Sequence, residues 1–415
     1  MNNLKYIVAL IAISIISISV SAQTEVDNYL NGVYGKGVIP GFSIVVIKND
    51  KVWFAKGYGV ESLSDTKIFT PNTVTAIGSL TKSFTALAVM QLVEKGMIDL
   101  DGRLTEYIPW FRTANKDKSD KITVRMLLNN SSGLYGGVNP SFDFTGKALE
   151  NLAHSLEGVY IINEPGKSFE YSNVAFSIAG LLVSKVSGLT YSNYLEENIF
   201  KPLKMRKSTT DPEKFIALHS IYGHYYGITK AIPARRAKEN ESGEFVPAGS
   251  VTRSCSADLA NYLIFLLQGG QFEGKRIINN ESLLEMWKPN SSFYGLSKDD
   301  GGENNRVSYC LGWMNTSIEN RDIIYHQGST GTMSSCTMID RKNKVAASIL
   351  MNIDVSFIDK YRFPSDINIL NNVLRIASGL EKSNYAIPVI KDPTINSFEL
   401  TEAETEKYKG ISQKF

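Results

Sequence analysis

Strand-like segments stand near the two ends of this 415-residue chain, and helical spacing fills the middle. "FSIVVIKNDKVWFAKGYGV", Phe42–Val60, is rich in β-branched and aromatic residues around a polar turn, which predicts a hairpin. Strand patterns return late in the chain, at 307–316, 321–328 and 334–352. The simplest arrangement is one antiparallel sheet made from both chain ends, with a large helical insertion between them. We therefore predict an α/β (α+β) fold with a cleft where sheet meets helices.

The first residues have the pattern of an export signal. Lys5 supplies a positive charge, Tyr6–Val20 is a nearly unbroken apolar run, and "VSA" ending at Ala22 offers small residues to a signal peptidase. The run is shorter than the ~20 residues that cross a bilayer, so an uncleaved anchor is the weaker alternative. We expect residues 1–22 to be removed and the protein to be periplasmic or secreted, without stable membrane insertion.

The rest of the chain divides into a main domain and a tail. We assign residues 23–380 to one main domain, with a sheet region at about 23–78 and 300–380 and a helical region at about 79–299. Residues 381–415 are polar, and we interpret them as a tail or as the start of an accessory domain that is missing here.

Charge and cysteine content exclude several classes of protein. Forty-four basic and forty-two acidic residues give a net charge of +2 with no long basic run, so nothing favours a nucleic-acid partner. The three cysteines are too few and odd in number for a disulfide scaffold, and their spacing matches no metal site. We expect buried free thiols at Cys255, Cys310 and Cys336.

Ser79 and Lys82 lie one turn apart at the start of an apolar helical segment, "IGSLTKSFTALAVMQL". A serine hydroxyl is a poor nucleophile until a base removes its proton, and burial favours a neutral lysine that can act as that base. The helix N-terminus also leaves backbone N–H groups free to bind an oxyanion. The S-x-x-K spacing alone is weak, because Ser64 and Lys67 repeat it in a polar turn, where we interpret it as coincidence.

Two further segments carry reactive side chains. Tyr171 and Asn173 precede an apolar helix, where a phenol can relay a proton and an amide can bind an amide-containing substrate. A core tyrosine with Asn173 as helix N-cap is the structural alternative. "IIYHQGSTG" ends a strand in His326 and Gly328, and the next N–H, that of Ser329, can pair with the N–H of Ser79 as an oxyanion hole. A structural histidine is the alternative there.

Taken in order, these segments resemble the serine β-lactamase and penicillin-binding protein superfamily, in particular its class C β-lactamase-like branch. That branch has the patterns S-x-x-K, Y-x-N, and K-T-G or H-x-G. "MLLNNSSGL" is also similar to one of its loops, as are "EPGKSFEYSN", "IFKPLKM" and "PAGSVTRSCSADLANYLIFLL". The resemblance covers roughly residues 26–379.

The resemblance implies an enzyme that hydrolyses an amide or ester through an acyl-serine, with no metal or organic cofactor. It implies Ser79 as nucleophile, Lys82 as its proton-accepting partner and Tyr171 as general acid/base. It makes Asn173 a ligand of the substrate amide and His326 the group that faces the substrate carboxylate or ester. Which of Lys82 and Tyr171 takes the first proton stays open, as does the oligomeric state.

Some positions depart from the pattern of the branch. His326 replaces a lysine that would be permanently charged, Tyr325 and Gln327 stand where glycine and threonine are common, and Asn130 replaces a loop histidine. These changes weaken the case for β-lactam resistance. A carboxylesterase, a D-Ala-D-Ala carboxypeptidase and a catalytically silent penicillin-binding-like protein therefore remain alternatives, each acting on or binding a small molecule or peptide.

Overall fold

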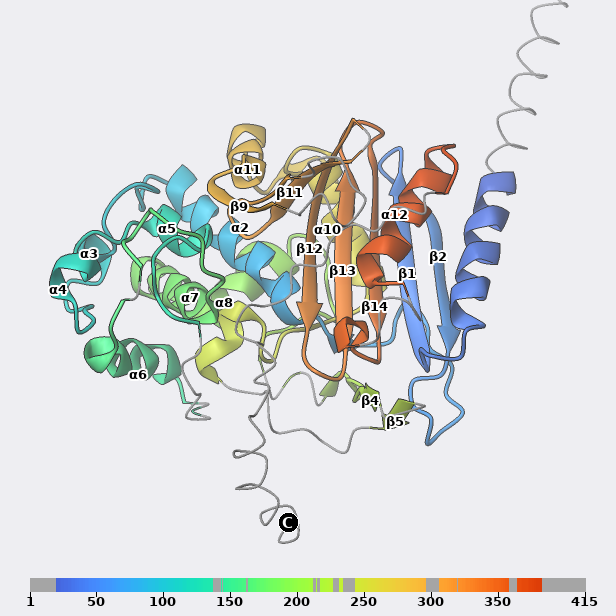
Figure 1. Ribbon diagram of the computed structural model, residues 1–415, viewed down its shortest axis with the longest axis horizontal. Coiled ribbons are helices and arrows are strands. Elements are labelled where there is room, and N and C mark those ends of the chain that lie inside the picture. Colours follow the sequence, from blue (N-terminus) through green and yellow to red (C-terminus); the bar gives the residue numbers. More distant parts are fainter. Residues whose placement is uncertain are drawn as a thin grey trace, which may run out of the picture.

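The computed structural model describes residues 20–382, except 137–142, 144, 162, 212–213, 215–216, 227–230, 234–242, 296–305, 319 and 358–363. Its centre is an eight-stranded sheet in the order β2-β1-β14-β13-β12-β11-β10-β9, in which each pair of neighbours is antiparallel (Figure 1). The strands are β1 (Gly41–Lys48), β2 (Lys51–Gly59), β9 (Ser291–Gly295), β10 (Arg306–Tyr309), β11 (Met314–Ile318), β12 (Arg321–Ser329), β13 (Ser334–Asp340) and β14 (Val345–Met351).

The pairing of β1 with β14 joins the two ends of the chain. The register runs from Phe42 opposite Met351 to Lys48 opposite Val345, which confirms the sheet predicted from the sequence. The hairpin turn between β1 and β2 is also where it was expected. Asn49 and Asp50 adopt φ values of 53° and 58°, the left-handed conformation that a two-residue hairpin turn requires.

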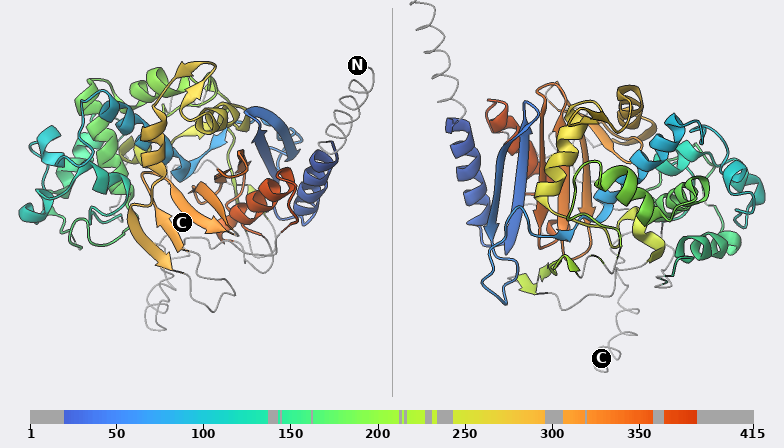
Figure 2. Two further views of the ribbon diagram at one scale, coloured as in Figure 1. Left: turned by 90° about the horizontal axis from the view of Figure 1, so that it is seen from above. Right: turned by 180° about the vertical axis from the view of Figure 1, so that it is seen from behind.

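Helices cover both faces of the sheet (Figure 2). The helix of residues 20–34 and α12 (Asp366–Ala377) lie on one face, where Asp27 accepts hydrogen bonds from Lys56 Nζ and Tyr58 Oη of the edge strand β2. α10 (Ser256–Leu267) lies on the other face. Because both faces are covered, β13 and β14 are buried along their full length.

The helical region lies to one side of the sheet and is organised around α2 (Thr81–Glu94). Residues from Thr81 to Leu92 of that helix are all buried, polar ones included. The other helices are α3 (Leu104–Tyr107), α4 (Lys116–Ser119), α5 (Val124–Leu128), α6 (Ala148–Ser155), α7 (Asn173–Ser187), α8 (Tyr191–Leu195) and α11 (Asn280–Trp287).

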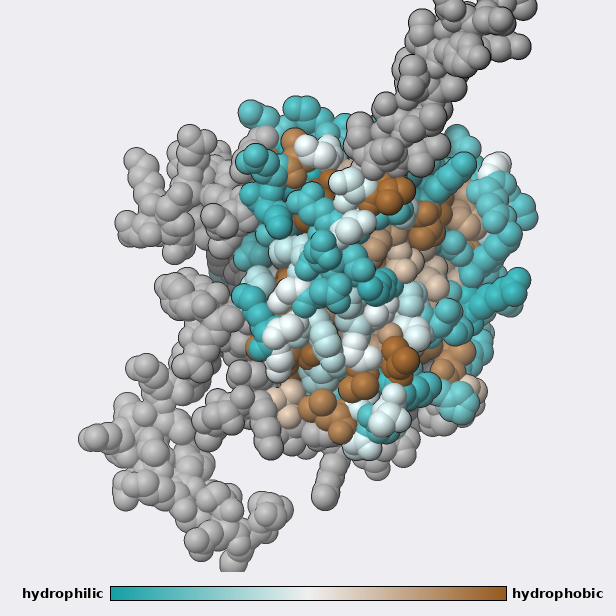
Figure 3. Space-filling view, turned by 90° about the vertical axis from the view of Figure 1, so that its right-hand side faces the viewer, coloured by the Kyte–Doolittle hydropathy of each residue, from teal (hydrophilic) through white to brown (hydrophobic). Residues whose placement is uncertain are grey.

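Among the described residues, no single helix is long and apolar enough to cross a membrane. The pair Asn173–Ser187 and Tyr191–Phe200 reaches that length and hydropathy together, but it is bent by 77°. The described surface at the β2 end of the molecule mixes hydrophilic residues with small, separate groups of hydrophobic ones (Figure 3). The three cysteines are free and buried, as the sequence predicts.

Candidate active site

Ser79 sits in a short 3₁₀ turn, Gly78–Leu80, that leads directly into α2. Gly78 has a φ of +50°, and a Cβ there would lie 2.7 Å from the amide nitrogen of Ser329 and 2.8 Å from its carbonyl oxygen. Only glycine permits both this backbone conformation and this close approach. The turn that carries Ser79 is therefore packed directly on the end of β12.

Lys82 is fully buried, and its Nζ lies among three acceptors. It donates to Ser79 Oγ at 2.9 Å, to Asn173 Oδ1 at 2.7 Å and to the carbonyl oxygen of Ala248 at 2.9 Å. Three acceptors match the three N–H donors of an ammonium group. In this arrangement the oxygen of Ser79 accepts from the lysine, so the Ser79 proton is available to a further base.

Two aromatic rings complete the surroundings of the amine. Nζ lies 4.8 Å from the ring centroid of Tyr171 and 5.5 Å from that of Phe176. Rings at these distances attract a cation through their π-electrons. The structure thus brings Ser79, Lys82, Tyr171 and Asn173 together in one cluster, although they come from segments about 90 residues apart.

The start of α7 decides between the two interpretations of Asn173. The N-cap is Ser172, whose side chain accepts from the amide of Ala175 at 3.0 Å. The alternative in which Asn173 caps the helix is therefore wrong. Since Ser172 takes the capping role, the Asn173 amide is directed at Lys82 instead.

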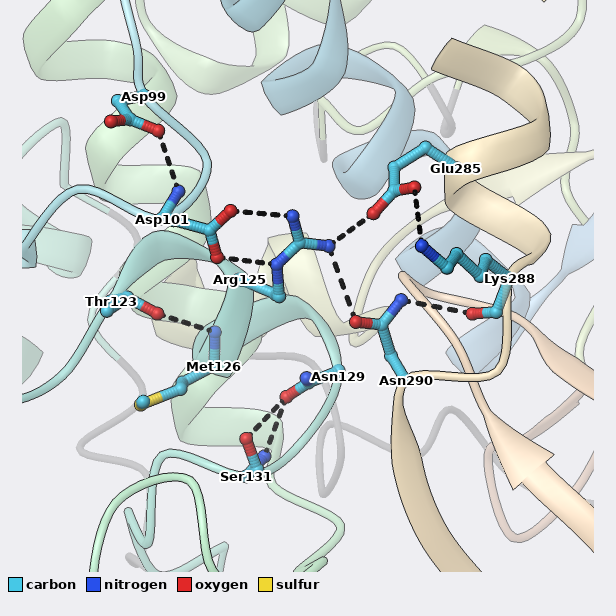
Figure 4. Close-up of polar contacts among 10 residues, drawn as sticks. All are labelled: Asp99, Asp101, Thr123, Arg125, Met126, Asn129, Ser131, Glu285, Lys288 and Asn290. Carbon is cyan, nitrogen blue, oxygen red and sulfur yellow. Dashed lines mark hydrogen bonds and ion pairs between the residues drawn. The ribbon is translucent and has the colours of Figure 1, made fainter. Parts of the chain in front are cut away.

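The loop after α5 is anchored by an arginine network (Figure 4). Arg125 donates from Nε and Nη2 to both carboxylate oxygens of Asp101, at 2.6 and 2.7 Å. Its Nη1 donates to Glu285 at 2.5 Å and to Asn290 at 3.3 Å. At the far end of the same helix, Asn129 Oδ1 accepts from the backbone and side chain of Ser131. Bidentate arginine–carboxylate contacts of this kind fix orientation as well as position.

Asn130 lies in this loop and holds the segment that carries Tyr171 through two hydrogen bonds. It has a φ of 58°, which asparagine tolerates better than most residues. Its Oδ1 accepts from the amide of Ser172 at 3.0 Å, and its carbonyl oxygen accepts from the amide of Glu170 at 2.7 Å. The residues on both sides of Tyr171 are therefore held by one residue, Asn130.

The last part of β12 has a partner on one side only. β11 pairs with β12 as far as Tyr325, whereas β13 continues to pair with it from His326 to Ser329. A strand edge of this kind can bind an extended ligand through its backbone. Gly328 has no room for a side chain, because a Cβ would lie 1.9 Å from the carbonyl oxygen of Ile77.

His326 is 1% exposed and contacts protein through both ring nitrogens. Nδ1 lies 2.6 Å from the carbonyl oxygen of Gln327, which can only accept, so we assign the ring proton to Nδ1. Nε2 is then the acceptor for the hydroxyl of Tyr309, 3.0 Å away. Burial, together with the nearby charge of Lys82, lowers the pKa of His326 to about 3, and the bond to Gln327 opposes this only in part. His326 is a neutral group here.

Sequence reasoning missed three contributors to the site. Tyr309 donates to His326, the carbonyl of Ala248 accepts from Lys82, and Gly249 packs on the turn that carries Ser79. Gly249 has a φ of +118°, and a Cβ there would lie 2.1 Å from the carbonyl oxygen of Gly78 and 3.0 Å from the amide of Ser79. The segment "PAGSVTRS" was singled out only by resemblance, because a backbone contact leaves no signal in residue spacing.

The comparison with protein families matches residues 26–370 to the family described as Beta-lactamase. This chain belongs to the beta-lactamase family. Within the family, it is 26% identical over 341 residues to Protein flp of Staphylococcus aureus (strain NCTC 8325 / PS 47), a match that covers 82% of this chain and 65% of that protein. It is 29% identical over 205 residues to the Teichoic acid D-alanine hydrolase of Staphylococcus aureus (strain MRSA252), which covers 49% of this chain and 48% of that protein.

Solved structures agree on the fold of this beta-lactamase family member. The octameric penicillin-binding protein homologue from Pyrococcus abyssi superposes with a TM-score of 0.71 at 23% identity, covering 87% of this chain and 78% of that one. EstCE1, a hydrolase with promiscuous acyltransferase activity, superposes with a TM-score of 0.68 at 16% identity, covering 83% and 97%. The expected β-lactamase/transpeptidase-like fold is confirmed.

Proposed function

We propose that this protein is an exported serine hydrolase that cleaves an ester or amide bond through an acyl-Ser79 intermediate. The observation that carries the proposal is the hydrogen bond from the buried Lys82 amine to Ser79 Oγ, in a cluster that also contains Asn173 and Tyr171. A buried amine next to a hydroxyl can take the hydroxyl proton when the amine is neutral, and burial favours the neutral form. Family membership and the hydrolase relatives support the general reaction class.

In the proposed reaction, Ser79 Oγ attacks the carbonyl carbon of the substrate and loses its proton to the Lys82–Tyr171 pair. The amide groups of Ser79 and Ser329 stabilise the negative charge that develops on the carbonyl oxygen. Tyr171 returns the proton to the departing alcohol or amine, which leaves Ser79 acylated. Water then attacks the acyl group and regenerates the free hydroxyl.

For the substrate, we propose a carboxylic ester or a D-alanyl ester or amide rather than a β-lactam. A β-lactam presents a carboxylate that a permanent cation at the third motif would bind. His326 stays neutral because its pKa is about 3, so it offers no such charge at neutral pH. The partial similarity to a protein described as a teichoic acid D-alanine hydrolase supports the same direction.

Export is part of the proposal and depends on the leader pattern of residues 1–22. The expected substrate is a small molecule or peptide outside the cytoplasm, and we propose that the reaction needs no metal or organic cofactor. Among the described residues, no group of three or more histidine, cysteine, aspartate or glutamate side chains could hold a metal ion.

Labelling with a fluorophosphonate, followed by mass spectrometry, tests the nucleophile. We expect one adduct on Ser79 in the wild type, none in Ser79→Ala and an unchanged adduct in the matched control Ser64→Ala. Turnover of a short-chain p-nitrophenyl ester, a D-alanyl ester, a D-Ala-D-Ala peptide and a chromogenic cephalosporin then ranks the substrates. Absence of any adduct on Ser79 would refute the proposed serine hydrolase function. After incubation with a penicillin, a stable penicilloyl adduct without ester turnover would favour a penicillin-binding role.

A further inference from the structure

We propose that Asp354 is a positioning residue for the oxyanion-binding amide of Ser329. The inference rests on the function proposed above, since it concerns how one donor of the oxyanion hole is held in place. Asp354 follows the end of β14, is 2% exposed, and lies outside every motif that the sequence singles out.

The carboxylate of Asp354 ties two segments together. The hydroxyl of Ser329 and the amide of Gly331, at 3.1 Å, both donate to Oδ2. The other oxygen, Oδ1, accepts from the amide of Ser356 at 3.0 Å and from its hydroxyl at 2.6 Å. Four donors therefore surround one buried carboxylate, and two of them belong to the end of β12 and the turn that follows it.

The sheet register explains why this tie reaches Ser329. Ser329 lies opposite Ser334 of β13, and Ser334 lies opposite Met351 of β14, so the three positions form one row across the sheet. Ser334 Oγ also donates to the carbonyl oxygen of Ile353, at 3.0 Å. Asp354 follows β14 and therefore lies beside the end of this row. Its side chain extends past the end of β13 and accepts a hydrogen bond from Ser329.

Ser329 needs this support because of its place in the fold. It is the last residue of β12, it is exposed, and β11 no longer pairs with the strand at this point. Terminal residues of a strand with a free edge are the first to move. The backbone of Gly78 lies directly against Ser329, since a Cβ on Gly78 would be 2.7 Å from Ser329 N. A small shift of Ser329 therefore moves its amide relative to Ser79, the residue after Gly78.

Donors from the protein occupy both oxygens of Asp354, so this side chain acts on Ser329 through the hydrogen bonds that it accepts. The effect of the carboxylate is then geometric. Oxyanion donors act only when they are held at the position that the oxygen takes in the transition state, and a misplaced reacting group loses up to about 10²-fold in rate.

The test compares an ester with the corresponding thionoester, in which sulfur replaces the carbonyl oxygen. Sulfur is a weak hydrogen-bond acceptor, so an intact oxyanion hole favours the ester and a misaligned hole loses that preference. The variants are Ser329→Ala, which removes the hydroxyl bonded to Asp354, Ser329→Thr, which restores it, and Asp354→Asn. Ser356→Ala is the matched control, because it removes a donor from the opposite carboxylate oxygen.

We expect Ser329→Ala and Asp354→Asn to lower kcat for the ester by roughly tenfold, to change KM by less than about twofold, and to reduce the ester-to-thionoester ratio in parallel. Ser329→Thr should recover most of the wild-type rate and ratio, and Ser356→Ala should have the smaller effect. Ser329 is exposed, so its variants are expected to fold even where those at Asp354 do not.

The outcomes separate this inference from the proposed function. If the wild type shows neither ester turnover nor a Ser79 adduct, both proposals fail. If the wild type is active but Ser329→Ala keeps its ester-to-thionoester ratio, the function stands and the role of Asp354 is refuted. A fall in thermal stability with an unchanged ratio likewise refutes positioning, because it would make Asp354 an anchor of the fold only.

Discussion

The spacing S-x-x-K occurs twice in this chain within 20 residues, and the two copies have different surroundings. Ser64 lies in an exposed turn, where its hydroxyl contacts Ser62 Oγ at 2.8 Å. Lys67 pairs with Glu61 at 2.7 Å, and its side chain is 62% exposed. Lys82 is fully buried and is bonded to Ser79, as well as to groups from two other segments.

The difference shows what the spacing does and does not specify. Three residues of separation place two side chains on one face only when the backbone is helical, and the turn around Ser64 is not. Even within a helix, the lysine changes the chemistry of the serine only where solvent is excluded and acceptors are fixed. The meaning of the motif therefore depends on Asn173, Ala248 and the glycines around Ser79.

The two lysines provide the sharpest contrast. Lys82→Met keeps most of the length of the side chain but removes its amine, and we expect turnover of an ester to fall by about 10²–10⁴-fold because proton transfer at Ser79 is lost. Lys67→Met breaks an ion pair between an exposed lysine and the buried Glu61, outside the Ser79 cluster, and should leave turnover within about twofold. Steady-state kinetics and fluorophosphonate labelling measure both. Equal effects of the two substitutions would contradict the comparison.

Gly249 tests whether the packing around Ser79 matters as much as its partners. In Gly249→Ala the new Cβ would lie 2.1 Å from the carbonyl oxygen of Gly78, at a φ of +118°. We expect a loss of about 2–3 kcal/mol in unfolding free energy, and ester turnover lower by up to about 10²-fold.

The control for this substitution is Gly37→Ala. Gly37 also has a positive φ, +70°, but a Cβ there meets nothing within 4 Å. Gly37→Ala should lower the free energy of unfolding by about 1 kcal/mol because of backbone strain, and it should leave kcat unchanged. A Gly249→Ala enzyme with normal kcat would show that the nucleophile turn tolerates displacement.

Substitution of Asp366 is expected to have the smallest effect on turnover. It should have the clearest effect on how the stability of the protein depends on pH. Burial raises the pKa of this carboxyl from an ordinary 3.8 to about 7, although Gln327 Nε2 donates to it at 2.6 Å. The folded state therefore binds the proton more tightly than the unfolded state. The contribution of Asp366 to stability should be fully present below about pH 4, decrease as the pH rises toward 7, and level off above that.

Asp366→Asn keeps the acceptor oxygen for Gln327 and removes the titration. We expect its unfolding free energy to vary less between pH 4 and 7.5 than that of the wild type, measured by urea denaturation across that range. Asp65→Asn, in the exposed turn beside Lys67, is the control and should retain the wild-type profile. An identical slope in Asp366→Asn and wild type would rule out Asp366 as the source.

The parts of the structure that the sequence predicts are those encoded in local patterns. β-branched and aromatic residues around a polar turn predicted β1 and β2, strand-like patterns predicted late strands, and the apolar run after Ser79 predicted a buried helix. Ser79, Tyr171 and Asn173 were found because they stand where a loop leads into a helix, and His326 was found because it stands near the end of a strand.

The parts that it does not predict depend on contacts between distant segments. Asp354 and Tyr309 are ordinary residues in their own stretches of sequence, and only the sheet register brings them beside Ser329 and His326. The acceptor from Ala248 is a backbone oxygen, which every residue possesses. The neutrality of His326 also required the fold, since burial rather than residue type lowers its pKa.

The pairing of β1 with β14 has a consequence for when the enzyme becomes competent during folding. Phe42 lies opposite Met351, and in the proposed mechanism Ser79 acts together with the amide of Ser329, so the two groups lie far apart along the chain. Contacts of such long sequence separation form late and slowly. A nascent chain that has only its first half therefore carries the serine and the lysine without the strand that would let them act, and reactivity arrives together with the completed sheet.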